Sequence, residues 1–550
     1  MPPYRPRTQL VTHEVTNQPP PLEDYNLFET NPPLQEALER EGGGGWSEQV
    51  TAYGTEMGRA ETIEDGRLAN KHLPEFMPFD RYGGRIDEVQ FHPSYHRMLK
   101  RGLEAGIASN PWGDTPGGHV AHTALHYLHS QIEPGTGCPI TMTYAAVPAL
   151  KTDADLAAEW LPRITGSGYD PASRPAAEKS AATIGMAMTE KQGGSDVRAN
   201  TTKAYGLGGS EYELTGHKWF CSAPMCDAFL TLAYTDEGLT CFLVPRWRPD
   251  GTRNQMHIQR LKDKLGNRSN ASAEIEYHGA YARRLGEDGR GVATIIEMVH
   301  HTRLDTALAP AAFMRAAFVQ AVHHTMHRRA FQRALIDQPM MQGVLADLAL
   351  EVEASLLMVM RVARAYDEAA GSDEARTLSR LTVALAKYWN NKRCPNFIYE
   401  AMECLGGAGY VEESCLPLLY REAPLNSIWE GSGNVICLDI LRTLEREPAA
   451  LPALLTEIEL ATGGHGAFDT ALVALKDRVA KPIAEVQARQ LAAQLALLLQ
   501  ASLMIRHAPN TVSDAFCATR LGGERSQVYG VLPEGTPARE IIARNWPAAG

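Results

Sequence analysis

A carboxylate in an unusual setting is the strongest chemical signal in this sequence. Glu430 lies between the indole of Trp429 and a Gly-Ser-Gly turn, within residues 426–434. A carboxylate that is partly desolvated by an aromatic neighbour has a raised pKa and becomes a stronger base. Such a group suits the removal of an acidic proton next to a carbonyl. The alternative is a carboxylate at the start of a helix, stabilised by the helix dipole.

A glycine-rich loop and a tryptophan lie upstream of this carboxylate. The loop, residues 189–195, follows a predicted strand, and its glycine pair allows backbone N–H groups to approach an anion closely. The hydroxyls of Thr189 and Ser195 could reach the ring edge and the pyrophosphate of a flavin. The ring of Trp219 could pack on a planar cofactor. Taken alone, the loop is more typical of an ordinary turn and the tryptophan of a core residue. Side by side they favour a flavin site.

The segments that must position these residues predict an α+β fold. Residues 1–45 are rich in proline and end in a run of glycines, which predicts an N-terminal arm and linker. Residues 46–180 show helical periodicity, residues 181–290 predict a compact β-domain, and residues 291–445 predict a C-terminal helical bundle. Residues 446–550 are helical again and form a C-terminal extension.

The β-domain is predicted from short runs of β-favouring residues that turn residues separate. The predicted strands are 183–188, 211–220, 228–234, 239–247 and 271–277. We expect the glycine-rich loop to leave the first of these strands. We expect Trp219 to lie at the end of the second.

Composition and charge limit the classes of function. The chain has 550 residues, of which 44% are hydrophobic, enough for a large core in several domains. Its 53 basic and 65 acidic residues give a net charge of -12, which disfavours a protein that coats nucleic acid. Nine cysteines without a CxxC pair are typical of free thiols in a reducing compartment.

The sequence predicts neither secretion nor membrane insertion. The N-terminal residues lack the apolar stretch of a signal peptide. The longest apolar run, Leu491–Ile505, is interrupted by Gln494 and Gln500, so it predicts a buried helix rather than a membrane span. We therefore expect a soluble cytoplasmic protein.

A group of histidines and a run of basic residues could suggest a metal site and a DNA-binding surface, but each has a simpler interpretation. The histidines that share one predicted helical face are His119, His122, His126 and His129. They have no obvious cysteine or carboxylate partner in the sequence, so no metal site is predicted. The local basic run consists of Arg260, Lys262, Lys264 and Arg268. A solvated face explains such a run, and DNA binding would require the charges to converge on one surface.

The chain resembles the acyl-CoA dehydrogenase flavoproteins between about residues 90 and 440. The motifs that carry the resemblance are Met188–Asp196, Leu261–Asn270 and Asn426–Asn434, in the order that this family shows. Within the family the chain is most similar to the AidB-like branch of the alkylation response. That similarity continues through both ends of the chain, including the C-terminal extension that ordinary members lack.

The resemblance implies roles for the matching residues. Glu430 occupies the position of the catalytic base. Arg328 matches an arginine that reaches the FAD of a neighbouring subunit, which implies an oligomer, typically a homotetramer. The other positions that the resemblance assigns to FAD are Met188, Thr189, Gly194, Ser195, Trp219, Cys221, Ser222, Gly406, Gly407, Ile428, Trp429, Gly431, Ser432, Gly433 and Asn434.

Within the β-domain the implied roles are more specific. Thr189 and its neighbouring backbone would bind the pyrimidine edge of the flavin, and Ser195 would lie near the pyrophosphate. Trp219, Cys221 and Ser222 would line the other side of the ring. Each of these roles comes from the family and not from spacing alone.

The implied reaction is a concerted oxidation of an acyl-CoA thioester. Glu430 removes the proton α to the carbonyl while the β-hydrogen leaves as hydride to flavin N5, and hydrogen bonds that polarise the carbonyl acidify the α-proton. The branch also implies a role in the adaptive response to DNA alkylation, with alkylating agents as a second class of substrate and double-stranded DNA as a partner. The alternatives are an ordinary dehydrogenase of fatty-acid or branched-chain catabolism, and a regulatory protein with an inactive flavin fold.

Four positions depart from the family pattern. Lys191 stands where proline is common, and Cys221 where threonine is usual. Gln332 replaces a glycine after Phe331, and Glu403 replaces a glutamine. These changes leave the flavin chemistry in place and bear mainly on acyl-CoA binding.

Overall fold

The structure, a computed structural model, describes residues 7–522 and 526–549 and divides the chain into two compact units. The β-unit comprises Glu64–Gly118 and Glu133–Asp305. The helical unit comprises the chain up to Ile63, His119–Ile132 and the chain from Thr306 onwards. The predicted α+β fold is confirmed, although the units do not follow the predicted domain boundaries.

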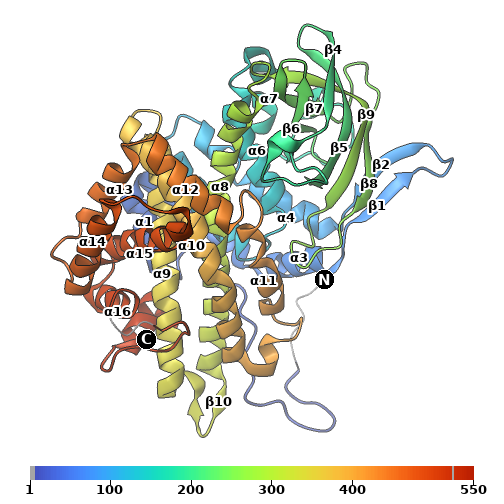
Figure 1. Cartoon of the computed structure of the whole chain (residues 1–550). Coiled ribbons are helices and arrows are strands. Elements are labelled where there is room, and N and C mark those ends of the chain that lie inside the picture. The colour runs from blue at the N-terminus through green and yellow to red at the C-terminus, as the bar shows by residue number, and fades with distance from the viewer. Residues whose placement is uncertain (1–6, 523–525, 550) are drawn as a thin grey trace. The chain divides into compact units, whose positions relative to one another are not determined.

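The β-unit is built around one sheet (Figure 1). Its strands are β3 (Ile184–Ala187), β4 (Lys203–Gly208), β5 (Glu211–Ser222), β6 (Ala228–Thr235), β7 (Gly238–Pro245), β8 (Met256–Leu261) and β9 (Ser272–Leu285). The strand order is β3-β6-β4-β5-β9-β7, and β7 also pairs with β6, so the sheet closes on itself. Closure removes exposed edges and encloses a core that includes Leu214, Phe229 and Phe242, all fully buried. The predicted strands are all present, whereas β4 and β8 were not predicted.

A hairpin and several helices complete the β-unit. The hairpin consists of β1 (Glu75–Phe79) and β2 (Arg85–Gln90), and it lies in a segment predicted to be helical. Its turn is fixed by Asp80, whose carboxylate accepts the backbone N–H groups of Tyr82 and Gly84. The helices of this unit include α4 (Pro93–Glu104), α6 (Gly137–Leu150) and α7 (Ala154–Ile164).

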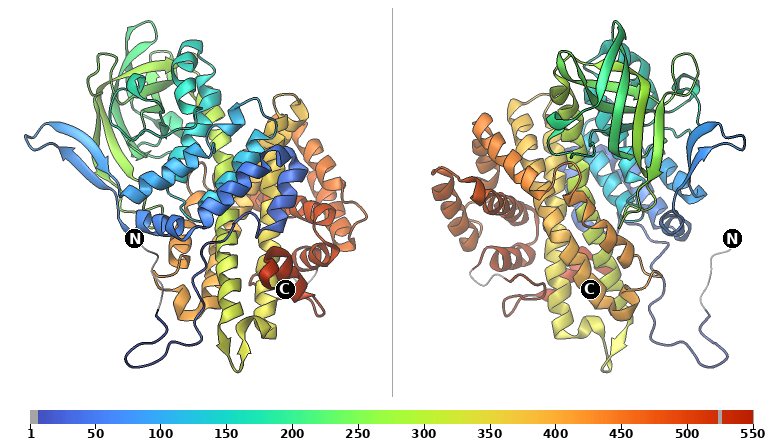
Figure 2. Two further views of the ribbon diagram at one scale, coloured as in Figure 1. Left: turned by 180° about the vertical axis from the view of Figure 1, so that it is seen from behind. Right: turned by 45° about the vertical axis from the view of Figure 1, so that its right-hand side comes forward.

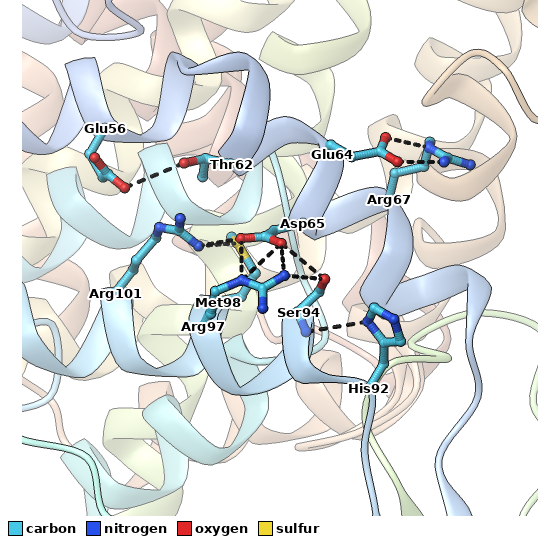
Figure 3. Close-up of polar contacts among 10 residues, drawn as sticks. All are labelled: Glu56, Thr62, Glu64, Asp65, Arg67, His92, Ser94, Arg97, Met98 and Arg101. Atoms are coloured by element: carbon cyan, nitrogen blue, oxygen red, sulfur yellow. Dashed lines mark hydrogen bonds and ion pairs between the residues drawn. The ribbon is translucent and has the colours of Figure 1, made fainter. Parts of the chain in front are cut away.

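Asp65 connects α3 (Ala60–Lys71) to α4 within the β-unit (Figure 3). Its carboxylate accepts hydrogen bonds from Arg97, from Arg101 Nη1 at 2.7 Å and from Ser94 Oγ at 2.9 Å. Burial tends to raise the pKa of Asp65, but the bonds from both arginines outweigh it and lower the pKa. The carboxylate therefore stays charged and holds the two helices together.

Two long helices organise the helical unit (Figure 2). These are α9 (Pro339–Glu368) and α10 (Asp373–Leu405), which pack against each other. The other helices of this unit include α1 (Pro32–Leu38), α2 (Ser47–Gly58), α11 (Leu416–Glu422), α12 (Gly433–Arg446), α13 (Ala450–Glu459), α14 (Gly466–Val479), α15 (Ala488–His507), α16 (Asn510–Arg520), α17 (Ala538–Asn545) and α8 (Gly291–His327) from Thr306 onwards.

Helix α5 (Gly118–Ser130) explains why the predicted domain 46–180 is divided. Two of its histidines, His119 and His129, have partners in the helical unit. Tyr53 Oη and His129 Nδ1 lie 2.7 Å apart, and His119 Nδ1 lies 3.0 Å from Asp367 Oδ1 in α9. These histidines are therefore used in packing.

The predicted N-terminal arm, residues 1–45, is only partly an arm. Leu34, Ala37 and Leu38 of α1 are fully buried, and α1 packs against α9. The glycine run predicted to be a linker forms a π-helical turn (Glu39–Gly43) and a 3₁₀ turn (Gly44–Trp46). The prediction of a linker was wrong because a composition rich in glycine does not reveal the apolar face just before it.

The C-terminal extension, residues 446–550, is part of the helical unit and not a separate domain. Helices α13 and α15 pack on α10, and α15 and α17 pack on α9. One helix, Glu485–His507, is long and apolar enough to cross a membrane by length and composition, but 67% of its apolar window is buried in the protein. It therefore has the character of the predicted core helix.

Arg315 of α8 joins distant parts of the helical unit. Its side chain is almost fully buried, and its guanidinium donates to the carbonyls of Thr30 and Asn545. Burial lowers the pKa of Arg315, as expected for a charge removed from water. One side chain thus satisfies carbonyls near both ends of the described chain.

Candidate active site

The glycine-rich loop of the β-unit is anchored by a buried ion pair. Lys218 Nζ lies 2.8 Å from Glu190 Oε1 and donates to Leu232 O at 2.8 Å, and neither charged side chain is exposed. Glu190 also accepts from Thr201 N and from Thr202 Oγ1, both at 2.6 Å. Burial alone would raise the pKa of Glu190, but the Lys218 ammonium lowers it to about 2. The anchor is therefore ionised at neutral pH.

The backbone of the loop is bound to strand β5. Trp219 N donates to Thr189 O at 2.7 Å, and Lys191 N donates to His217 Nε2 at 3.0 Å. Proline at position 191 could not make the second bond, because it has no N–H. At Gly194 a Cβ would lie 2.3 Å from Thr189 Oγ1, so the loop closes on itself only with glycine there.

Trp219 is half-buried and carries cations near its ring. Lys262 Nζ lies 3.3 Å from the ring centroid, Lys191 Nζ 5.6 Å and the Arg260 guanidinium carbon 5.9 Å. Glu274 pairs with both Arg260 and Lys262, at 2.8 Å and 2.7 Å. The predicted basic run thus gathers partly at this indole and is partly neutralised there.

Cys221 does not contribute a thiol to the accessible surface. Its side chain is fully buried, and burial raises the pKa of Cys221 well above its usual range. The side chains of a strand alternate between faces, so Cys221 faces the core while Ser222 does not. Ser222 is half-buried, and its hydroxyl lies 3.1 Å from Ser272 Oγ. The expectation that the Cys221 side chain lines a flavin is corrected, whereas the role of Ser222 there stays a prediction.

Glu430 lies in a turn of the helical unit, just before α12. Its φ is +57°, in the left-handed region that non-glycine residues rarely adopt, and Gly431 follows with φ +100°. Glu430, Trp429 and Ser432 are half-buried, whereas Ile428 and Asn434 are exposed. Trp429 Nε1 donates to Asn426 Oδ1 at 2.6 Å, which fixes the orientation of the indole.

Lys387 of α10 holds this turn from inside the protein. The residue is almost fully buried, and Nζ donates to Asn426 O at 2.9 Å, Trp429 O at 3.0 Å and Gly431 O at 2.8 Å. No sequence motif marks this lysine. Its only sequence signal is that it directly follows the apolar stretch 383–386.

The remaining predicted residues of the helical unit lie at two further places. Gly406 and Gly407 end α10 with exposed backbone, and a Cβ on either would meet nothing within 4 Å. Arg328 precedes a hairpin of β10 (Arg329–Ala330) and β11 (Arg333–Ala334), and its Nη1 donates to Asn17 O at 2.6 Å.

Gln332 stands at the tip of that hairpin. Its φ is +67°, which explains why glycine is usual at this position. Phe331 beside it also has a positive φ, of +51°, and its side chain is 94% exposed.

The predicted site residues therefore divide between the units. Residues 188–195 and 219–222 belong to the β-unit, whereas Arg328, the glycine pair at 406 and the segment 428–434 belong to the helical unit. The β-unit group offers glycine backbone, hydroxyls and a half-buried indole, which suit a planar cofactor with a pyrophosphate. The helical group offers a half-buried carboxylate in a constrained turn, which suits proton abstraction.

Known family models match the segments that contain the predicted site residues. Residues 17–171 match the adaptive response protein AidB N-terminal domain, residues 185–280 the acyl-CoA dehydrogenase middle domain, and residues 289–445 the acyl-CoA dehydrogenase C-terminal domain. The putative acyl-CoA dehydrogenase AidB of Escherichia coli K12 is 44% identical over 520 residues, covering 94% of this chain and 96% of that protein.

Solved structures show the same fold over almost the whole chain. Caenorhabditis elegans ACDH-11 in complex with C11-CoA has a TM-score of 0.85 and 27% identity, covering 98% of both chains. The apo form of Bd2924 has a TM-score of 0.82 and 28% identity, covering 90% of this chain and 99% of that one. Members of this family are FAD-dependent oxidoreductases that act on CH–CH groups. The chain belongs to the acyl-CoA dehydrogenase family, within its AidB-like branch.

Proposed function

We propose that this protein oxidises the Cα–Cβ bond of acyl-CoA thioesters, with Glu430 as the base. The observation that carries the proposal is the turn at Glu430, where a half-buried carboxylate is kept in a left-handed backbone conformation by bonds on both sides of it. Strained backbone of this kind persists where function requires one orientation of a side chain.

The residues of the β-unit fit FAD. Gly193 has a φ of +139° and open space where a side chain would stand, so a phosphate group can approach the loop closely there. The half-buried indole of Trp219 and the hydroxyl of Ser222 suit a ring system, and the cations near Trp219 suit a ligand that carries negative charge. FAD, when bound, supplies the acceptor for the β-hydrogen. Thr189, Ser195 and the loop backbone orient it.

The oxidation of the Cα–Cβ bond needs one base for the α-proton and one acceptor for the β-hydride. The carboxylate of Glu430 takes the α-proton, and the electron pair of the Cα–H bond forms the new Cα=Cβ bond. The β-hydrogen leaves with its own electron pair. A base placed in a fixed turn contributes about 10²- to 10⁴-fold to such a proton transfer.

Anaerobic titration with C11-CoA tests this proposal. We expect the flavin absorbance of the purified protein to bleach, and Glu430→Gln to slow bleaching by at least about 10²-fold while FAD stays bound. Glu413→Gln, at an exposed glutamate of the same unit, is the matched control and should behave as the wild type. Equal bleaching rates in Glu430→Gln and the wild type would exclude Glu430 as the base.

We propose a second role, in the response to DNA alkylation, on the strength of the AidB-like N-terminal domain and of unpaired cations. Most basic side chains of the extension pair with acids, as Arg506 does with Glu457 and Arg520 with Asp347. Four exposed cations of α10, α12 and the C-terminal extension have no ion pair among the described residues: Lys392, Arg446, Lys481 and Arg489. Lys392 and Arg489 converge, because a Cβ on Gly433 would lie 3.1 Å from Lys392 Nζ and 3.6 Å from Arg489 Nη2.

Fluorescence anisotropy with duplex DNA at several salt concentrations tests this second role. If DNA binds these cations, Lys392→Gln and Arg489→Gln should each lower the slope of log K against log salt by about one. Arg539→Gln, whose partner is the exposed Asp337, is the control and should keep the wild-type slope. No binding at low salt, together with brisk turnover of acyl-CoA, would favour the ordinary dehydrogenase of catabolism. Loss of an alkylating agent in the presence of the protein would instead support a direct detoxifying activity.

We also propose a homotetramer in the cytoplasm. All nine cysteines are free, and eight are buried, which suits a reducing compartment. Large apolar side chains of the helical unit are exposed, including Phe331, Tyr410 at 81% and Ile428 at 64%, as expected for a surface covered by another subunit. Light scattering coupled to gel filtration would give the mass, and a monomer at micromolar concentration would contradict the assembly.

A further inference from the structure

We propose that Lys387 is a positioning residue that holds Glu430 in its reactive conformation. The inference rests on the proposed function of Glu430 and adds a residue to it. Lys387 lies on α10, in a different element from the base, and three of its contacts are hydrogen bonds to main-chain carbonyls. For that reason neither the sequence of the turn nor the family motif reveals it.

The geometry of the three hydrogen bonds surrounds Glu430. Two of the accepting carbonyls belong to Trp429 and Gly431, the residues immediately before and after the base, and lie 3.0 Å and 2.8 Å from Nζ. The third, Asn426 O at 2.9 Å, lies one turn earlier. An ammonium has three N–H donors, so these three bonds use its full donor capacity. The peptide unit that joins Trp429 to Glu430 and the peptide unit that follows Gly431 are thereby oriented.

The backbone of the turn needs such support. A non-glycine residue at φ +57° and a glycine at φ +100° form a segment that does not hold its own shape, and a left-handed residue costs about 1–2 kcal/mol. Carbonyls that are removed from water must also be bonded, or each costs about 1–3 kcal/mol. Charge-assisted bonds from one buried ammonium meet both requirements. Without them, we expect the peptide unit before Glu430 and the one after Gly431 to reorient, and Glu430 to move with them.

Lys387 is itself held in place. The next turn of α10 carries Asn391, whose side-chain amide donates to Lys387 O at 2.8 Å and to Thr306 O at 2.9 Å. Burial on a well-packed helix removes the rotational freedom that an exposed lysine has. The ammonium is therefore a rigid support, which a solvated lysine would not be.

The position of a base affects rate more than affinity. A carboxylate displaced by about 1 Å loses about 10²-fold in rate, whereas ground-state binding of the substrate changes little. Lys387→Met should therefore lower kcat by about 10²-fold and leave KM within about threefold. A residue that only supports the fold would lower the amount of folded protein and leave kcat per folded molecule unchanged.

Hydrogen–deuterium exchange and kinetics of the FAD-loaded full chain together test the proposal. The variants are Lys387→Met, Lys387→Arg and Lys387→Gln, and the matched control is Asn390→Leu, which removes a buried bond of the same helix to Ala307 O. In Lys387→Met we expect amide exchange to rise at least about tenfold in the peptide covering residues 426–434 and not elsewhere in α10 or α12. Lys387→Arg should restore part of kcat, because it keeps the charge and the donors.

The outcomes separate this proposal from the proposed function. If exchange in residues 426–434 is the same in Lys387→Met as in the wild type, or rises no more than in Asn390→Leu, Lys387 does not position the turn. If C11-CoA fails to reduce even the wild-type flavin, the dehydrogenase function fails, but the exchange comparison still decides the role of Lys387. Should Lys387→Met not fold, Lys387→Gln gives the same comparison, because it keeps donors and loses the charge.

Discussion

Two buried lysines support the two halves of the chemistry in different ways. In the β-unit, Lys218 binds the side chain of Glu190, and Glu190 in turn binds the residues after the glycine-rich loop. In the helical unit, Lys387 binds main-chain carbonyls of the turn that carries Glu430. The first anchor depends on a partner side chain and its ionisation. The second depends on the lysine and on the shape of the backbone.

We therefore expect the glycine-rich loop and the Glu430 turn to tolerate amino-acid substitutions differently. A loop anchored through a carboxylate loses its support when that carboxylate is replaced or protonated. A turn anchored through carbonyls keeps its support through most substitutions of its own side chains, since every residue has a carbonyl.

The largest expected effect follows from removing Glu190. Glu190→Ala leaves the Lys218 ammonium buried without its carboxylate and should cost about 3–5 kcal/mol of unfolding free energy. Urea denaturation monitored by tryptophan fluorescence would measure it. A loss below about 1 kcal/mol would mean that the loop does not depend on the ion pair, and the contrast between the two anchors would not hold.

The next largest effect is a decrease in the free energy of unfolding as the pH falls. The folded pKa of Glu190 is about 2, below its usual value of 4.5, so its contribution is complete above pH 4.5 and is lost as pH falls towards 2. We expect this residue to account for roughly 2–3 kcal/mol of lost stability over that range. Denaturation of the wild type and of Glu190→Gln at several pH values gives the difference, which should shrink in acid. A difference that stays constant from pH 6 to pH 3 would contradict the assignment.

A smaller effect is expected from the side chain of Asn426. Asn426→Ala removes the bond to Trp429 Nε1 but keeps the carbonyl that Lys387 binds, so it should cost only about 1 kcal/mol. Thermal denaturation gives the stability, and hydrogen exchange in residues 426–434 should stay close to that of the wild type. Exchange as fast as in Lys387→Met would show that the turn relies on side chains after all.

The smallest effect is expected at Lys191. Lys191→Pro restores the residue that is common in the family but removes the N–H bond to His217 Nε2, worth about 1 kcal/mol. The stiffer proline returns about 0.4–1 kcal/mol by restricting the unfolded chain, so the net change should lie within about 1 kcal/mol. Calorimetry would measure it. A loss of several kcal/mol would indicate that the loop conformation differs from that of the proline-containing relatives.

Much of the fold could be predicted because it rests on local patterns. The strands around Trp219 and the buried helix at Leu491–Ile505 follow from β-favouring runs and from apolar length. Strand β4 was missed because its sequence, Lys203–Gly208, contains two glycines and has little intrinsic β preference. It is a strand because β5 and β6 pair with it.

The candidate site could be predicted only where a motif names its residues. Glu430 and Thr189 stand in such motifs, whereas Lys387 acts on a segment that follows it at a distance in the sequence. The orientation of Cys221 was also missed, because alternation along β5 becomes certain only when the register with β9 is known. Long-range contacts and strand register are the information that one sequence does not carry.

Arg315 has a consequence for how the chain is made. Its guanidinium can donate to the carbonyl of Asn545 only after that residue is synthesised, 230 residues later. At translation rates of about 5–20 residues per second, that delay is roughly 10–50 s. During this time the Arg315 guanidinium lacks one of its two carbonyl partners, so α17, which carries Asn545, is the element expected to dock last. Release from the ribosome, rather than the emergence of α8, then sets the moment at which the helical unit can close.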